Sequence, residues 1–246
     1  MKKALFVFMI SLLLIGCLLT SRVTDLINAV KPSEAEMIEG TSTLTVSQGT
    51  ERDFMAFLAE NNIQIVSIKG TEGGAGTVGG LIDLELQNND QFAHTIILPC
   101  GLVFVPENAD LQKMMVIQPV SIDLNPGETV TITPFVACIQ SSQDAPSAGD
   151  VYSSVEQSEG KLAVLADCFC QNDLNQENIQ GQMSVQFATW MTADNSNYLD
   201  KLGSEQTGAL GQVLGGQVGE LAGSFVSMIA PDAQKWLDRC NIKVGE

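Results

Sequence analysis

Alternating hydrophobic and polar positions predict β-strands in the middle of the chain. In residues 82–87, three aliphatic residues alternate with acidic or amide residues. This period of two is typical of a strand with one buried and one solvated face. Residues 88–90 have turn chemistry, and we expect residues 92–98 to return as the partner strand of a hairpin.

A second hairpin is predicted further along. Residues 119–124 lead into Asn125-Pro126-Gly127-Glu128, where proline and then glycine suit the central positions of a type II turn, and residues 129–139 leave it. Repeated short strands with turn signals between them favour an antiparallel, immunoglobulin-like β-sandwich. The cysteine-tryptophan-cysteine order of immunoglobulin domains is absent, so the likeness concerns architecture alone.

Helices are predicted both before and after the strands in the sequence. A short helix is expected over residues 51–60, and residues 161–172 and 231–242 carry apolar residues at helical intervals. Residues 178–195 fit a helix with one apolar face, although a strand over 183–191 also fits. We expect this helix to dock on the sandwich; its apolar face contains Ile179, Met183, Phe187, Trp190 and Met191.

These patterns give a mainly β fold with helical additions. The predicted organisation is an export signal at residues 1–17, a stalk or linker at 18–47, a β-sandwich at 48–153 and a helical region at 154–246 packed on the sandwich.

The first residues look like an export signal. Two lysines precede an apolar run that ends in Leu14-Ile15-Gly16-Cys17. This ending resembles the lipobox of bacterial lipoproteins, which implies cleavage before Cys17 and a diacylglycerol on its thiol. Cleavage beyond Cys17 and an uncleaved anchor helix are the alternatives, because the apolar run continues to about the length of a spanning helix. All three place the rest of the chain outside the cytoplasm, anchored to a membrane or secreted.

The net charge of the chain limits the classes of partner that it can bind. The 246 residues include 29 acidic and 12 basic side chains, a net charge of −17. Such a surface repels phosphate backbones, so nucleic acid is not expected as a partner. A protein or a small ligand is expected instead, of a kind that the sequence does not identify.

Five cysteines follow Cys17, and we expect disulfides in an oxidising compartment. Their odd number leaves at least one unpaired within the chain. We predict a bridge from Cys100 to Cys138, and a second from Cys168 or Cys170 to Cys240. A zinc site at the close pair is disfavoured, because the single histidine, His94, has no partner at ligand spacing. No metal or cofactor is predicted.

Glycines recur at every fourth position near the C-terminus: Gly211, Gly215, Gly219 and Gly223. On a helix they would form a flat stripe that lets another backbone approach closely. Because Glu220 opposes membrane insertion, we expect this segment, partly loop and partly helix and closed by Pro231, to pack on its own domain or on a second copy of the chain.

Three segments together resemble bacterial exported, lipoprotein-type β-sandwich proteins of unassigned function. They are LPCGLVFVP, LNPGETVTITPFVACI and VQFATWMTADN, and the resemblance covers about half of the chain. It implies the fold and the compartment, and no reaction.

The QFATW segment is similar to the Gln-x-Ala-x-Trp motif of thioester domains in Gram-positive surface adhesins. In that family a cysteine thiolate attacks a glutamine carboxamide and expels ammonia, leaving a bond that can capture an amine. The resemblance implies Gln186 as acyl donor, with Cys100 or Cys138 as the thiol. Thr189 stands where the motif usually has isoleucine.

Other catalytic arrangements are not supported. His94 and Cys100 on one strand would lie about 20 Å apart, and residues 173–178 lack the glycine and final glutamate of a calcium loop. We therefore expect no enzyme, but an exported, lipid-anchored binding or envelope-organising protein. The alternatives are a thioester adhesin and an unrecognised hydrolase.

Overall fold

The computed structural model describes residues 42–43, 51–72, 76–172, 174, 178–195 and 219–245. Antiparallel sheets over residues 63–157 are followed by helices over residues 160–239, as the sequence predicts. The strand order of the sheets does not establish an immunoglobulin-like topology.

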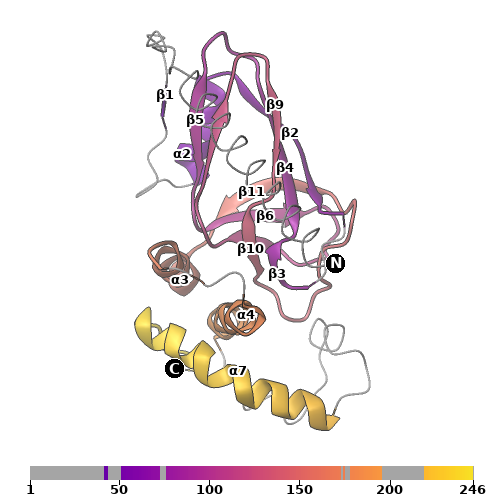
Figure 1. The fold of residues 1–246 in the computed structure, drawn as a ribbon, viewed down its shortest axis with the longest axis vertical. Helices are drawn as coiled ribbons and strands as arrows, with labels where there is room; N and C mark the ends of the chain where they lie inside the picture. The colour runs from indigo at the N-terminus through magenta and orange to yellow at the C-terminus, as the bar shows by residue number, and fades with distance from the viewer. Residues whose placement is uncertain are drawn as a thin grey trace, which may run out of the picture. The chain divides into compact units, whose positions relative to one another are not determined.

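The strands of the described residues form three sheets (Figure 1). All of their ladders are antiparallel except the short pair β1–β5. The first sheet has the order β1 (Ser42–Thr43), β5 (His94–Leu98), β8 (Val120–Leu124). The second has the order β2 (Ile63–Gly70), β4 (Ile82–Asn88), β9 (Thr129–Ile132). The third has the order β11 (Tyr152–Gln157), β6 (Leu102–Pro106), β7 (Met114–Val116), β10 (Phe135–Cys138), β3 (Val78–Gly80).

Strand β4 shows why the alternating pattern is a reliable signal. Its aliphatic residues Ile82, Leu84 and Leu86 are fully buried, and its polar residues between them are only partly exposed. On this second face Asp83 accepts hydrogen bonds from two threonine hydroxyls and Glu85 accepts one from Ser67. The buried face joins a hydrophobic cluster that also contains residues of β5 and β8.

Both predicted hairpins are wrong in their pairing. Strand β4 pairs with β2 and β9, whereas β5 and β8 pair with each other in the neighbouring sheet. The turn at residues 125–128 does form: Glu128 N–H donates to Asn125 O at 3.0 Å, and Gly127 has the positive φ of 72° that a type II turn requires. It connects strands of different sheets.

The fully buried Asn88 joins the two crossings between these sheets. Its side-chain amide donates to the carbonyls of Phe92 (2.8 Å) and Leu124 (3.1 Å). Its backbone N–H donates to Glu128 O at 2.9 Å, and its carbonyl accepts from Gly127 N–H at 2.9 Å. Asn88 therefore satisfies backbone groups of both connections, where a continuous hairpin ladder is absent.

The predicted helices are present as α2 (Glu51–Glu60), α3 (Gly160–Cys170), α4 (Ile179–Ala193) and α7 (Gly219–Arg239). The ambiguity over residues 183–191 is resolved as helix. Helix α4 lies between the sheets and α7 (Figure 1), and it contacts β3, β10, α3 and α7. It is accordingly buried on nearly all sides from Met183 to Thr192, whereas Ile179, which we expected on its inner face, is 73% exposed.

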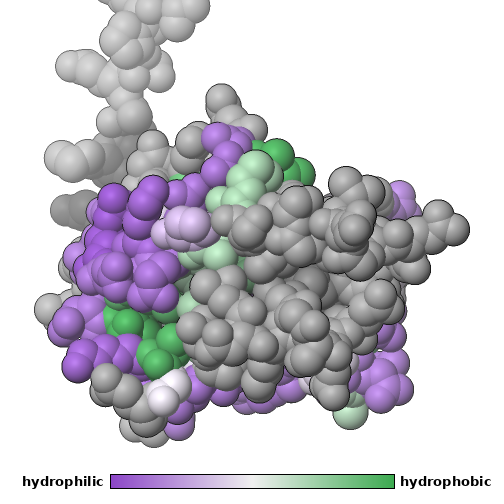
Figure 2. Space-filling view, turned by 90° about the horizontal axis from the view of Figure 1, so that it is seen from below, coloured by the Kyte–Doolittle hydropathy of each residue, from purple (hydrophilic) through white to green (hydrophobic). Residues whose placement is uncertain are grey.

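Helix α7 extends beyond the predicted boundary at Pro231. The proline lies inside the helix rather than closing the segment before it. A proline removes one helical hydrogen bond, and Pro231 is exposed, so water can satisfy the carbonyl one turn earlier. Figure 2 shows the helical side of the molecule from below, where the coloured residues are mostly hydrophilic with small hydrophobic areas between them.

Candidate functional site

Two disulfides cross-link helix α3, one to the turn before β6 and the other to the end of α7. Cys100 pairs with Cys170, and Cys168 pairs with Cys240. The prediction that Cys168 or Cys170 bonds Cys240 is confirmed, and the predicted Cys100–Cys138 bridge is wrong. Residues two apart on an α-helix point about 200° apart, so the two cysteines of α3 reach opposite partners: the turn before β6, and the end of α7.

These bridges indicate an oxidising environment outside the cytoplasm. Each closes a loop of about 70 residues, 70 and 72 in sequence separation. On the chain-entropy model such a loop stabilises the fold by about 4 kcal/mol. None of the helices in the described part of the chain is long and apolar enough to cross a membrane.

Cys138 is the free cysteine of the described residues, and it is fully buried in β10. Its Sγ lies 3.4 Å from Met114 Sδ on the neighbouring strand. Burial raises the pKa of the Cys138 thiol well above its ordinary value. The thiol is therefore protonated at neutral pH.

Gln186 of α4 is directed at the same residue. Its Oε1 accepts from Cys138 N–H at 3.0 Å, and its Nε2 donates to Cys138 O at 2.7 Å. The N–H of Cys138 also donates to Thr77 O at 2.9 Å. Gln186 is fully buried, and the carboxamide carbon is held against the backbone of the residue that carries the free thiol.

This contact has a structural consequence. A glutamine in the middle of a buried helix must satisfy its amide, and here it does so on an interior strand, which fixes α4 against β10. Thr189, one turn later, donates to Val185 O at 2.9 Å and so is satisfied within its own helix. The departure from the thioester motif at this position leaves no unpaired hydroxyl.

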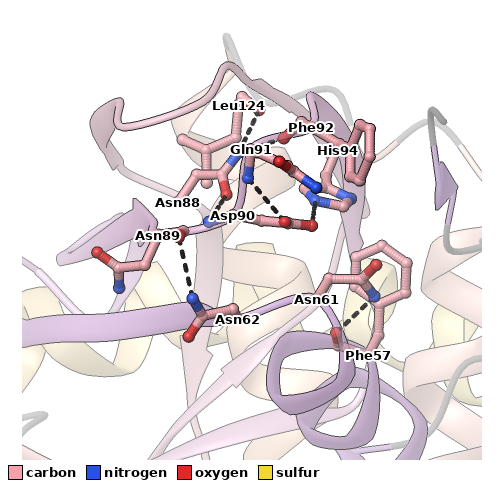
Figure 3. A network of polar contacts seen from close by, with 10 residues as sticks. All are labelled: Phe57, Asn61, Asn62, Asn88, Asn89, Asp90, Gln91, Phe92, His94 and Leu124. Carbon is pink, nitrogen blue, oxygen red and sulfur yellow. Dashed lines mark hydrogen bonds and ion pairs between the residues drawn. The ribbon is translucent and has the colours of Figure 1, made fainter.

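His94 is the first residue of strand β5 and is held by contacts within the fold. It is 2% exposed, its Nε2 lies 2.9 Å from Asp90 Oδ2, and the ring of Phe57 meets it edge-on. Figure 3 shows the surrounding polar network, in which asparagine side chains and the Asp90 carboxylate bond neighbouring backbone groups. Cys100, the cysteine nearest to His94 in the sequence, is held in its disulfide with Cys170.

Several predicted residues lie outside the described residues. They include Cys17, the two glycines Gly211 and Gly215, and the acidic positions of the calcium-like loop. Gly219 and Gly223 belong to helix α7. Among the side chains that the structure describes, no group of three or more His, Cys, Asp or Glu residues is arranged to hold a metal ion.

The chain was compared with family models, with curated proteins and with solved structures, and none of them matches it.

Proposed function

We propose that the chain is a membrane-anchored, extracytoplasmic protein that binds a partner or organises the cell envelope without catalysis. The observation that carries the proposal is the pair of disulfides, which fix α3 to the sheets and to the end of α7. A fold cross-linked in this way suits an oxidising compartment and a rigid binding surface. The N-terminal signal supplies the route, and Cys17 the point of lipid attachment.

An immunoglobulin-like sandwich is the scaffold that we propose for this role. The two crossings between the sheets, from β4 to β5 and from β8 to β9, support it, because chain crossings between facing sheets are a property of β-sandwiches.

The anchoring is tested by fractionating bacterial cells that express the full chain or its Cys17→Ala variant. We expect the variant to leave the membrane fraction, to lose incorporated labelled fatty acid and to keep its thermal melt. Ser21→Ala is the matched control and should stay in the membrane. A cytosolic, unprocessed chain with reduced thiols would overturn the proposal, and membrane retention of the Cys17→Ala variant would replace the lipid by an anchor helix.

A surface adhesin with an internal thioester is the second candidate, and the contact between Gln186 and Cys138 favours it. The disulfide of Cys100 leaves Cys138 as the candidate thiol. The step would form a bond between Cys138 Sγ and the Gln186 carboxamide carbon, break that carbon's bond to nitrogen, and release the nitrogen with the thiol proton as ammonia. Deep burial would protect the product from water.

Intact-mass measurement of the unreduced protein decides this candidate. A thioester lowers the mass by one ammonia relative to the sequence with two disulfides, and methylamine added to the unfolded protein restores the amide nitrogen as a methylamide. Gln186→Glu and Cys138→Ala should each show no deficit. A wild-type mass without the deficit excludes the thioester, and leaves Gln186 as the anchor of α4.

A further inference from the structure

A cavity of about 330 Å³ lies between the first half of α4 and the last half of α7. Gln180, Gly181 and Ser184 line it from α4, and Asp232, Lys235, Trp236 and Arg239 line it from α7. Its volume is at the lower end of the range of small-molecule sites. It lies apart from Cys138 and Gln186, whose contact is on the side of α4 that meets β10.

The charge of the cavity differs from that of the chain. Acidic side chains outnumber basic ones by 29 to 12 overall, yet this lining contains two basic residues and one acidic residue. In an acidic protein such a local reversal attracts small anions to one place on the surface.

The carboxylate of the cavity is already occupied within the protein. Asp232 Oδ1 accepts from Lys235 Nζ at 2.7 Å, and Oδ2 accepts from Gln180 Nε2 at 2.9 Å. These hydrogen bonds lower the pKa of Asp232, so it stays ionised and bound to its neighbours. The one carboxylate of the lining is therefore already paired within the protein, whereas the two cations together carry more donors than this carboxylate accepts.

The donors are carried by the two cations. Lys235 has three ammonium N–H groups, one of which reaches Asp232, and its side chain is 74% exposed. The Arg239 guanidinium has a 3.5 Å contact with Asn172 Oδ1, which engages one of its five N–H groups weakly. A planar guanidinium with free donors suits a carboxylate, which it can bind in a bidentate manner.

A flat apolar surface adjoins these donors. The Arg239 guanidinium lies 4.7 Å from the centre of the Trp236 ring, and Phe169 holds that ring edge-on at 5.2 Å. Leu174, which is 1% exposed, is also part of the lining. The cavity thus combines cationic donors with an indole and an aliphatic side chain.

We propose that this cavity binds a small organic carboxylate with a flat or short apolar body. The carboxylate would bind Arg239, with Lys235 at the mouth, and the apolar body would pack against Trp236. This inference rests on the proposed function, because it names the class of ligand that the proposed binding protein would bind.

The test is a titration of the full chain in detergent, followed by the two tryptophan indole N–H signals in a nitrogen-15 correlation spectrum. Benzoate and indole-3-acetate are the carboxylate probes, benzamide is the neutral isostere and inorganic phosphate is the anion without an apolar body. Trp236→Phe assigns the signals. We expect both carboxylates to shift the Trp236 signal, leaving Trp190 in place, and benzamide and phosphate to bind at least about tenfold more weakly.

Variants identify the residues that bind. Arg239→Met should weaken benzoate at least about tenfold, Lys235→Met by less, and the exposed, remote Lys69→Met not at all. Equal binding of benzoate and benzamide, stronger binding of phosphate, unchanged affinity in a folded Arg239→Met protein, or no shift up to millimolar probe would each overturn the proposal. Because membrane anchoring and disulfide content are measured separately, such a failure leaves the proposed function standing.

Discussion

The side-chain amide of Gln186 makes its two hydrogen bonds with the backbone of Cys138, a residue 48 positions earlier in the chain. Both residues are fully buried. The contact joins an interior strand to the central helix, so it acts on stability whether or not the two side chains ever react.

Replacing Gln186 by methionine should destabilise the protein. Methionine keeps the length of the side chain but leaves the Cys138 carbonyl without its donor, while the Cys138 N–H keeps Thr77 O as partner. A buried unsatisfied group costs about 1 to 3 kcal/mol, and we expect that loss in the free energy of unfolding by urea. Gln64→Met, on an exposed position of β2, should change it little; equal effects of the two substitutions would contradict the anchoring role.

Replacing both cysteines of one disulfide should lower the free energy of unfolding. We expect the double variant Cys168→Ala, Cys240→Ala to lose about 4 kcal/mol, the loop-entropy value for a 72-residue separation. Peptide mapping of the unreduced wild type should yield Cys100 linked to Cys170, and Cys138 alkylated only after denaturation. A fragment that links Cys100 to Cys138 would show that the pairing in the structure is not that of the protein.

Local sequence patterns were sufficient to predict the strands and helices, but they were insufficient to predict which strands pair with each other. The alternation of β4 and the helical spacing around Trp190 each depend on neighbours in sequence, and both elements are present. Strand pairing depends on contacts between residues far apart in the sequence, and the hydrogen bond from Asn88 to Leu124 O, across 36 residues, is one of these contacts. Turn chemistry at residues 125–128 identifies a reversal, but the same turn serves a hairpin or a crossing between sheets.

The candidate site was partly accessible from the sequence. The motif identified Gln186, but its partner stayed open between Cys100 and Cys138, because the choice depends on which cysteine is taken by a disulfide. The helix predicted over residues 161–172 does place Cys168 and Cys170 on opposite sides. The two cysteines therefore need disulfide partners on opposite sides of the helix. The predicted helix does not identify Cys100 as the partner of Cys170, since that requires the packing of α3 on the turn before β6.

The link at Asn88 gives a third prediction. Asn88→Ala removes the donors to Phe92 O and Leu124 O, and we expect a loss of about 2 to 3 kcal/mol in unfolding free energy because two carbonyl partners are affected. Hydrogen exchange should rise in both connections, residues 89–93 and 125–128. The neighbouring, exposed Asn89→Ala is the control; if both variants exchange alike, the two crossings are not joined through Asn88.

Stability should fall at alkaline pH through Tyr152. Burial, and next the nearby Cys138 and Asp150, raise the pKa of the Tyr152 phenol far above its ordinary value. The folded state then keeps a proton that the unfolded state releases above pH of about 10. The stabilising contribution is therefore complete below that pH and declines above it, by at most about 1.4 kcal/mol per pH unit.

The Tyr152→Phe variant isolates this effect. It loses the hydrogen bond from the hydroxyl to Gln112 O, so we expect about 1 kcal/mol less stability at neutral pH and a shallower decline between about pH 9 and pH 11. Urea unfolding at a series of pH values measures both. Because burial raises the pKa of Cys138 in the same direction, Cys138→Ala in the Tyr152→Phe background should flatten the profile again. Identical alkaline slopes for wild type and Tyr152→Phe would show that the phenol is not protected from ionisation by the fold.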